Sequence, residues 1–360
     1  LCALEAVSLL VGAVCLPEDL EKNQDAESRE MILLNLEDNR DTNRGELAAR
    51  GGIEALCTCA LGNSKVESVA IRVAALRALR DAVDSHDANQ SRLFSAEVPR
   101  ETRKRNVGNM SGPEPALLAL GRTALKAEMK LEREAALTTL ESAVRGNIDG
   151  QILLVSTLAP TGLGDFDGDS FEDDDNDVDF AGETSLGGLF ARAMLRATSS
   201  TLASTSSSSA LSSEDEKKVH FIEAYASTIA LKAMLEDNED AKIRALRVNL
   251  QPLSEIGSSK SAELLLPRCV RSLAIAQKFD DSNGSLQCSI LRLLIAWLSD
   301  CALAVHSFVT SDASHVPTLT DLVKFSPLED VRTLSVVCLG CCLAYHGKDD
   351  YSIASNVLDV

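Results

Sequence analysis

The sequence predicts an all-α fold, and three features of it support this prediction. Apolar residues recur at intervals of three and four along most of the 360 residues, as they do in helices buried on one side. The strict alternation of apolar and polar residues that is typical of strands is rare. Aromatic residues make up only 4% of the chain, so small and aliphatic side chains must fill the core. Because one compact domain of this length would be unusual, we expect a helical repeat array or two subdomains.

The helical signal is strongest between Gly284 and His346. One helix is predicted from Leu286 to Cys301, with apolar residues on two neighbouring sides. Other elements should pack against both sides, so the helix should lie in the interior. Burying each large apolar side chain contributes roughly 1.5–3 kcal/mol, more than helix propensity can supply. The expected core residues here are Leu294, Trp297, Leu298, Cys301 and Phe308.

A second helix is expected to open at Ser326-Pro327-Leu328-Glu329. Ser326 can cap free N–H groups, Pro327 fits the first helical position, and Glu329 can reach back to the cap. Apolar residues then follow at helical spacing through Tyr345.

Three segments of this region carry a family resemblance. They are Arg292–Phe308, with its tryptophan, cysteine and phenylalanine, then Val316–Leu319 with its Val-Pro pair, and Val337–Gly340. Their spacing resembles the end of the globular head of the general vesicular transport factor family, which are golgin-like tethers of the early secretory pathway. The sequence departs from the family at Ala302, where proline is common, so the turn after Cys301 is expected to differ.

Net charge and cysteine usage restrict the function. The formal charge of −19 argues against a nucleic-acid binder and against binding anionic lipid by bulk charge, so proteins are the expected partners. The ten cysteines lie mostly within apolar helical patterns, which indicates a reducing compartment. We find no signal peptide, and Arg292 and Asp300 interrupt the longest apolar run, so we expect a soluble protein. The chain starts at Leu1 without methionine, and we expect it to be a fragment.

The N-terminal region is predicted as three helical segments. Leu4 to Val14 forms the first, and Leu16 to Asn43 reads as a loop plus a second, short helix. Leu47 to Leu61 gives the third, and Gly62-Asn63 suits a left-handed cap at its end.

Two similar segments predict helical repeats. Ile71 to Val83 contains an Ala-Ala-Leu stripe and is followed by Asn89-Gln90, which we interpret as the turn that starts the next unit. Glu132 to Val144 repeats the pattern 61 residues later, and the polar loop from Val98 to Pro115 explains why this exceeds the usual repeat of about 40 to 47. The pattern resembles an armadillo repeat, whose small residues let neighbouring helices approach closely.

The tether resemblance recurs in patches from Ile71 to Tyr345. Gly150-Gln151 opens a further helix, as the equivalent Gly-Gln does in the tether family.

Two low-complexity insertions interrupt the predicted array. Nine acidic residues lie between Asp165 and Asp179 without a lysine or arginine, and Thr198 to Ser213 is almost all serine, threonine and alanine. Such composition cannot order itself, so both are expected to be disordered. The apolar island Leu186–Leu195 between them is expected to dock on the core. The predicted domains are therefore residues 1–160 (repeats), 161–215 (insertion) and 216–360 (C-terminal repeats).

Three helices are predicted between the insertion and the Gly284–His346 region. They are predicted at Lys217–Leu235, near Ala241–Leu250 and at Ala262–Lys278. Ser213 is a candidate cap for the first of them, and phosphorylation of Ser212 or Ser213 would add favourable negative charge at that helix N-terminus.

Two cysteine clusters are candidate metal sites. Cys338, Cys342 and His346 share a helical face with Cys341 beside them, but tetrahedral zinc sites take ligand pairs from turns and a second pair is missing. We therefore interpret these cysteines, and likewise Cys57 and Cys59, as buried small apolar residues.

The acidic run contains Asp165-x-Asp167-x-Asp169, which matches the start of a calcium loop. Ser170 and Asn176 replace the glycine and glutamate that such a loop requires, which favours a plain acidic insertion over weak calcium binding.

No catalytic pattern is present. The five histidines are scattered, and the sequence lacks a phosphate loop, a dinucleotide fingerprint and a nucleophile elbow. The one basic cluster is predicted to be a solvated loop or a contact for an acidic partner segment; it comprises Arg100, Arg103, Lys104 and Arg105. We predict a protein that is not an enzyme and needs no cofactor or metal.

We interpret the chain as the C-terminal part of an armadillo-like α-solenoid head that binds proteins. The resemblance implies a peripheral membrane tether of ER-to-Golgi and intra-Golgi transport, with Rab-type GTPases, SNAREs and golgins as partners, located in the cytoplasm on Golgi and vesicle membranes. It also implies a homodimer through a coiled coil, which we expect beyond Val360 because no heptads lie within the chain. The alternatives are an unrelated armadillo-type scaffold or nuclear transport adaptor, and a metal-dependent enzyme built on the Cys338 cluster.

Overall fold

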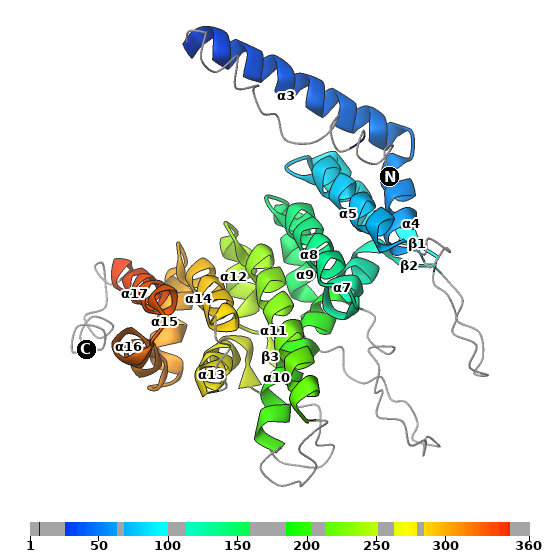
Figure 1. The fold of residues 1–360 in the computed structure, drawn as a ribbon. Coiled ribbons are helices and arrows are strands. Elements are labelled where there is room, and N and C mark those ends of the chain that lie inside the picture. Colours follow the sequence, from blue (N-terminus) through cyan, green and yellow to red (C-terminus); the bar gives the residue numbers. More distant parts are fainter. Residues whose placement is uncertain are drawn as a thin grey trace. The chain divides into compact units, whose positions relative to one another are not determined.

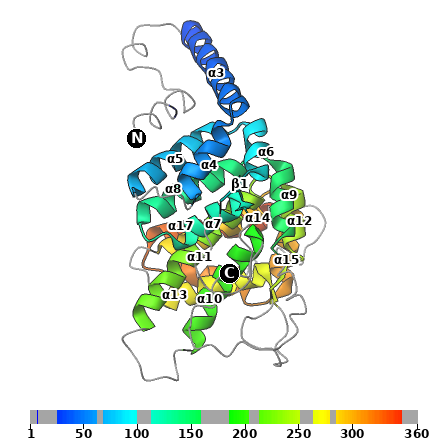
Figure 2. The same ribbon diagram turned by 90° about the vertical axis from the view of Figure 1, so that its right-hand side faces the viewer.

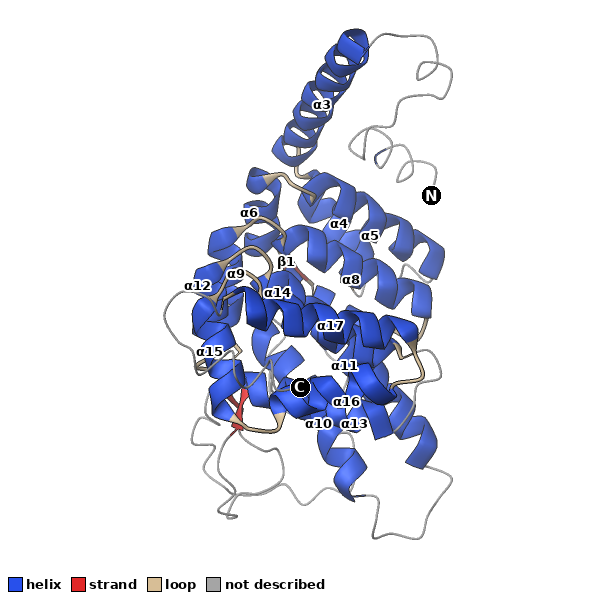
Figure 3. Ribbon diagram, turned by 90° about the vertical axis from the view of Figure 1, so that its left-hand side faces the viewer, coloured by secondary structure: helices blue, strands red, loops and turns tan. Residues whose placement is uncertain are grey.

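The computed structural model describes residue 7 and residues 26–62, 68–99, 113–158, 185–203, 213–250, 263–278 and 284–345. It divides into two compact units, Leu1–Gly150 and Gln151–Val360, which are treated separately below. Nearly all elements in the described ranges are α-helices, which confirms the predicted all-α class (Figure 3). Within those ranges no helix is both long and apolar enough to cross a membrane.

In its described residues the first unit contains six helices from α3 onward and one short antiparallel strand pair. The helices are α3 (Ala26–Ala49), α4 (Gly52–Leu61), α5 (Val69–Val83), α6 (Asp87–Ser95), α7 (Ala116–Lys126) and α8 (Lys130–Val144). The strands are β1 (Glu97–Val98) and β2 (Glu114–Pro115). Helices α5 and α8 lie side by side and are packed against α4 and α7, respectively (Figure 2).

Helix α9 (Ile148–Ser156) spans the boundary, and the described part of the second unit continues with eight helices and another strand pair. The helices are α10 (Leu186–Ala203), α11 (Ser213–Leu235), α12 (Glu239–Ala245), α13 (Leu265–Lys278), α14 (Ser285–Leu298), α15 (Ala302–Ser311), α16 (His315–Phe325) and α17 (Glu329–Ala344). The strands are β3 (Asn249–Leu250) and β4 (Glu263–Leu264).

The helices follow a three-helix repeat of the armadillo type. A short first helix (α6, α9, α12 or α15) leads to a second helix (α7, α10, α13 or α16) and then to a third (α8, α11, α14 or α17). In the second unit the third helices form one tier and the second helices form the other (Figure 1). The sequence alone indicates two copies, whereas the described residues contain four.

Each repeat begins with the same backbone turn, which a residue with positive φ makes possible. Ser85, Gly146, Asp237 and Asp300 have φ values of 54°, 73°, 55° and 51°. Only one of the four is glycine, although this region of φ disfavours other residues. The turn therefore recurs because the repeat geometry requires it.

The residue after the turn caps the first helix in three of the four repeats. The Asn147 and Asn238 side chains accept hydrogen bonds from the backbone N–H groups of Gly150 and Ala241, at 2.9 and 3.0 Å. His86 Nδ1 accepts from Asn89 N at 3.2 Å. These side chains satisfy N–H groups that have no partner within the helix.

The two strand pairs occupy equivalent places, between the first and second helices of their repeats. Glu97 and Val98 pair with Pro115 and Glu114, and Asn249 and Leu250 pair with Leu264 and Glu263. The helix predicted near Ala241–Leu250 is therefore too long, because it ends at Ala245 and a strand follows.

The N-terminal predictions need three corrections. The region interpreted as a loop and short helix is largely one helix, α3, and the helix predicted from Leu47 to Leu61 is divided at Gly51, whose φ of 76° starts α4. Gly62 ends α4 in an extended conformation, with φ −65° and ψ 136°, so its predicted left-handed cap is wrong. Of the helix predicted at Leu4–Val14, only Val7 lies within the described residues, and it is helical.

Helix boundaries near the C-terminus also differ from the prediction. Helix α14 ends at Leu298 because Asp300 makes the repeat turn, so Cys301 starts α15 and does not belong to α14. Helix α17 begins at Glu329, and Leu328 caps it without a side-chain bond. Ser326 Oγ instead accepts from Leu328 N at 3.3 Å, so the predicted capping box is wrong.

The apolar island predicted to dock on the core does so. Leu189 and Phe190 of α10 are fully buried and Met194 is 1% exposed, and α10 packs along α11. The backbone of α10 continues to Ala203, so the start of the serine-rich run is helical. Helix α11 begins at Ser213 itself, which makes this serine the first helical residue rather than the cap. The acidic run and Ser212 lie outside the described residues.

The core of the second unit is closely packed around Trp297. Leu294, Trp297, Leu298, Cys301 and Phe308 all have no exposed surface. Trp297 also donates from Nε1 to the backbone oxygen of Lys242 in α12, at 3.1 Å. The indole thus joins the first and third helices of one repeat.

Replacing Trp297 with alanine should lower the free energy of unfolding by about 3–5 kcal/mol, because a large cavity opens in a packed core. Urea unfolding followed by circular dichroism would measure this, since Trp297 is the single tryptophan and its fluorescence is lost. Phe325→Ala is the matched control: Phe325 is 72% exposed, so its loss should cost less than about 0.5 kcal/mol. Similar losses for both variants would contradict an interior Trp297.

Candidate protein-interaction surface

The third helices α11, α14 and α17 form a row in the second unit. Each packs against the next, and the second helices α10, α13 and α16 cover the row from one side (Figure 1). The side facing away from this cover is open to solvent.

Hydrogen bonds and close packing fix the row. Thr228 Oγ1 of α11 donates to Ser289 Oγ of α14 at 2.7 Å. At the start of α14, a Cβ built on Gly284 would lie 2.4 Å from Leu328 Cδ1, so glycine permits this close approach without a shift of the Leu328 side chain. At the other end, Tyr345 Oη donates to Asp300 Oδ1 at 2.7 Å. Helices α14 and α17 therefore run parallel.

The first unit has a corresponding pair, α5 and α8. Arg72 of α5 forms a two-pronged ion pair with Glu132 of α8, with the Nη2 to Oε2 bond at 3.0 Å. This hydrogen bond raises the pKa of Arg72 above its usual value. Thr139 Oγ1 adds a bond to the backbone oxygen of Leu76 at 2.9 Å. The same type of helix is thus stacked in both units.

A polar side chain in the first helix holds the end of the third helix of its own repeat. Gln90 Nε2 donates to the backbone oxygens of Ser142 and Arg145, at 2.9 and 3.0 Å. Gln151 Nε2 donates in the same way to Ala233 and Glu236, also at 2.9 and 3.0 Å. We call these bonds the helix-end clamp.

The next repeat uses a lysine for the same purpose. Lys242, four residues after the cap Asn238, donates from Nζ to the backbone oxygen of Ser299 at 2.6 Å and is 3% exposed. Its positive charge lies at the carboxyl end of α14, where the helix dipole favours it. The clamp also links successive repeats, because Asn238 Nδ2 donates to Gln151 Oε1 at 2.9 Å.

The clamp corrects the interpretation of Asn89-Gln90 as a turn. Both residues lie within α6 and are buried, and the turn is made by Ser85 instead. Asn89 Nδ2 donates to the oxygen of Ala82 in the last turn of α5, at 2.8 Å. The pair thus holds the ends of two third helices at once. A glutamine or lysine four residues after each side-chain cap is the sequence signal that could have identified the helix-end clamp.

The open side of the row combines apolar, aromatic and cationic residues. Ile222 and Tyr225 of α11 are 40% and 37% exposed, and Val337 of α17 is 45% exposed. Ser285 and Arg292, two turns apart, are the exposed residues of α14. We call these five residues the row surface. Tyrosine and arginine beside aliphatic residues are enriched in protein–protein interfaces.

The row surface was not identified from the sequence. Tyr225 and Arg292 belong to helices whose apolar residues predicted burial, and only the structure shows which side of each helix its neighbours leave open.

The cysteines do not form a metal site in the described residues. Cys57, Cys269, Cys338 and Cys342 are buried, and burial raises the pKa of Cys57, Cys269 and Cys342 to about 12 and also raises that of Cys338. No group of three possible ligands converges in the described ranges. The half-buried Cys341 Sγ lies 3.5 Å from Ser299 Oγ. His346 and the Asp165 calcium-like motif lie outside the described residues, as do Arg100, Arg103, Lys104 and Arg105.

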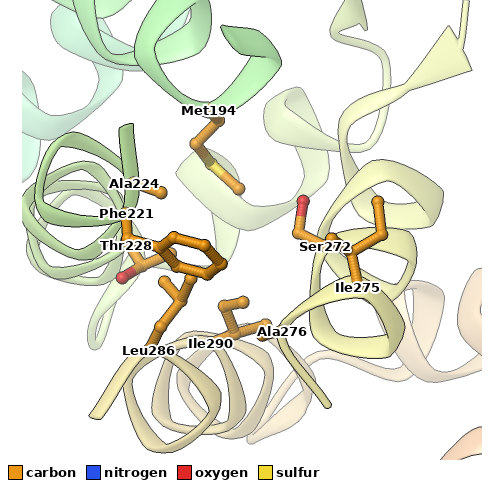
Figure 4. Close-up of a pocket in the computed structure, with 9 residues that line it drawn as sticks. All are labelled: Met194, Phe221, Ala224, Thr228, Ser272, Ile275, Ala276, Leu286 and Ile290. Carbon is orange, nitrogen blue, oxygen red and sulfur yellow. The ribbon is translucent and has the colours of Figure 1, made fainter. Parts of the chain in front are cut away.

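A small apolar hollow lies between α10, α11, α13 and α14 (Figure 4). Its walls include Met194, Phe221, Thr228, Ser272 and Ile290, and its empty volume is about 280 Å³ including the part open to solvent. Thr228 and Ser272 hydrogen-bond within the protein, to Tyr225 O and Arg268 O. The hollow offers no converging polar groups, so it has the character of a packing gap between four helices rather than that of a ligand site.

Stacked three-helix repeats with an open row of third helices define a helical-repeat scaffold. The sequence pattern of the Uso1/p115-like vesicle tethering proteins, head region, matches residues 32–357. The chain therefore belongs to this family, which confirms the resemblance to golgin-like tethers.

One curated relative and one solved structure illustrate the similarity. "Golgin candidate 6" from Arabidopsis thaliana is 27% identical over 371 residues, covering 99% of this chain and 35% of that protein. The chain thus spans about a third of that relative's length. The crystal structure of an engineered protein matches with a TM-score of 0.46 and 14% identity, covering 95% of this chain and 97% of the other.

The helix-end clamp should contribute measurably to stability. Gln151→Leu leaves the oxygens of Ala233 and Glu236 without their donor, so we expect a loss of about 1–3 kcal/mol in urea unfolding. We also expect faster amide exchange near Asn238. The exposed Gln277 provides the control, since Gln277→Leu should change stability by less than about 0.5 kcal/mol. Equal effects of the two variants would show that the clamp bonds add nothing.

Thiol labelling at pH 8 should separate the described cysteines into two groups. Cys59 and Cys341 are half-buried and should react first in the native protein. Cys57, Cys269 and Cys342 should react only on unfolding, because their pKa near 12 leaves almost no thiolate and burial excludes the reagent. Mass spectrometry of the labelled peptides would check the order. Early labelling of Cys269 would contradict the packing of α13.

Proposed function

We propose that this chain is the protein-binding head region of a vesicle tether that acts in ER-to-Golgi and intra-Golgi transport. Membership of the vesicle tethering family carries the proposal, since the pattern of its head region matches residues 32–357. The relative with a golgin name supports a role at the Golgi.

The proposed activity is binding without catalysis. The row surface supports it, because Tyr225 and Arg292 are exposed on neighbouring helices that their packing holds rigid. A rigid surface loses little conformational entropy when a partner binds, which favours affinity. In the described residues the exposed groups form no nucleophile, base and orienting group in mutual contact, which is why we propose a scaffold.

The proposed partners are Rab-type GTPases, SNAREs and golgins, with the head located in the cytoplasm on the surface of Golgi and vesicle membranes. The chain's charge of −19 disfavours direct attachment to anionic lipid, so we propose that membrane contact is indirect, through these proteins. A homodimer of the full-length protein through a coiled coil beyond Val360 is part of the same proposal.

Direct binding to purified proteins tests the proposal. We expect the chain to bind a Rab-type GTPase loaded with a non-hydrolysable GTP analogue, or a SNARE cytosolic domain, in isothermal titration calorimetry. Replacing Tyr225 and Arg292 with aspartate should weaken this binding by about 2 kcal/mol or more, as loss of an interface hot spot does. Both side chains are exposed, so the melting temperature should not change.

Leu303→Asp is the matched control, because Leu303 is 56% exposed but lies on the first helix α15, away from the row surface. This variant should bind as the original chain does. Absence of binding to every Rab-type GTPase and SNARE tested would count against the tether proposal. Equal loss in both variants would count against the row surface as the site.

A further inference from the structure

The segment that contains the acidic run, residues 165–179, is joined at its two ends. Ser185 Oγ donates to the backbone oxygen of Thr157 at 3.2 Å, and Gly187 N donates to Thr157 Oγ1 at 3.1 Å. These bonds hold the end of α9 against the start of α10. Residues 159–184 therefore start and finish at one place in the fold, which we call the loop stem.

The acidic run combines negative charge with aromatic side chains. Its nine carboxylates are accompanied by Phe166 and Phe171, and Phe180 follows directly. These are three of the nine phenylalanines in a chain that is only 4% aromatic. Segments that merely stay in solvent are poor in aromatic residues. The composition is that of a segment that binds a surface carrying both cations and exposed apolar groups.

A surface of this kind lies beside the loop stem, where α9 and α12 are neighbours (Figure 3). Arg244 Nη1 of α12 lies 3.5 Å from Ser156 Oγ, one residue before the stem. Arg244 and Arg247 are both exposed, and neither forms an ion pair with a carboxylate of the described residues. Leu153, three residues before Ser156 and hence on the same side of α9, is 58% exposed. We call Leu153, Arg244 and Arg247 the stem surface.

We propose that the acidic run binds the stem surface of its own chain. Its carboxylates pair with Arg244 and Arg247, and a phenylalanine of the run packs on Leu153. Charge complementarity favours this occupant, because the run carries nine of the carboxylates of a chain whose net charge is −19 and lacks any cation of its own.

The length of the segment also favours binding within the chain. Phe166 follows Leu158 by eight residues, which can span about 26 Å, and the stem surface begins beside the stem itself. A short tether of this kind gives an effective concentration in the millimolar range. Contacts that would be weak between separate molecules are therefore sufficient to hold the run in place.

The stem surface is an interaction site separate from the row surface, because it lies on the first helices α9 and α12 and just after them. It fits acidic segments that contain aromatic residues. A partner protein with such a segment must displace the acidic run. The proposal does not depend on Rab-type GTPases or SNAREs, so its failure would leave their proposed binding to the row surface untouched.

Fluorescence anisotropy of a labelled peptide with the sequence of residues 163–181 tests the proposal. We expect saturable binding to a variant in which glycine and serine replace residues 163–181. Binding to the original chain should be about fivefold weaker or more, because its own run competes at a high effective concentration. Arg244→Glu together with Arg247→Glu in the glycine-serine variant should weaken binding by about tenfold or more, as should raising the salt concentration from about 0.05 to 0.5 M.

Arg77→Glu together with Lys324→Glu is the matched control, since both residues are exposed on other helices and the net charge changes equally. This variant should bind the peptide as before, and circular dichroism should show unchanged folding in all variants. A peptide with serine at positions 166 and 171 should bind about threefold more weakly or worse, through loss of apolar contact.

Absence of saturable binding would overturn the proposal, and so would equal loss of affinity in the two charge variants. Equal binding to the original chain and to the glycine-serine variant would show that the acidic run does not occupy the surface, which would overturn binding within the chain.

Discussion

The backbone oxygens at the carboxyl end of each third helix impose the main constraint on this fold. These oxygens have no partner within their own helix, and the repeat turn buries them among neighbouring helices. Gln90, Gln151 and Lys242 supply the missing donors from the first helix of the same repeat. Each donor sits four residues after a cap, so the turn, the cap and the clamp must occur together.

This constraint explains why the repeats tolerate very different lengths. The turns at Gly146 and Asp237 enclose the acidic and serine-rich segments, yet Gln151 reaches the end of α11 as Gln90 reaches the end of α8. Insertions between the first and second helices, or between the second and third, do not disturb the clamp. The geometry of the third helices, and with it the row surface, is kept while the connecting segments vary.

Periodicity predicted the helices and the interior position of the segment around Trp297, because amphipathic spacing and burial follow directly from side-chain chemistry. It could not predict the breaks at Gly51 and Asp300, because an apolar pattern continues across them while the backbone changes direction. Positive φ at Ser85 and Asp237 gives no sequence signal, since nothing in the residue type requires it. Tertiary contacts determine these positions.

Tertiary contacts, which local sequence does not encode, also determine the helix-end clamp and the row surface. Buried glutamine is uncommon, and Asn89-Gln90 was interpreted as a turn because these residues favour turns when considered locally. Exposure of Tyr225, Arg292 and Val337 depends on which side of each helix its neighbours cover, a property of the packed array rather than of any one segment.

The array assigns different roles to the two sides of α17. Its inner side carries Val331, Ser335, Cys338 and Cys342, all fully buried, and completes the core of the last described repeat. Its outer side carries Val336, Val337 and Leu343, which are exposed in the described residues. In a repeat protein each layer buries its apolar surface only against the layers beside it.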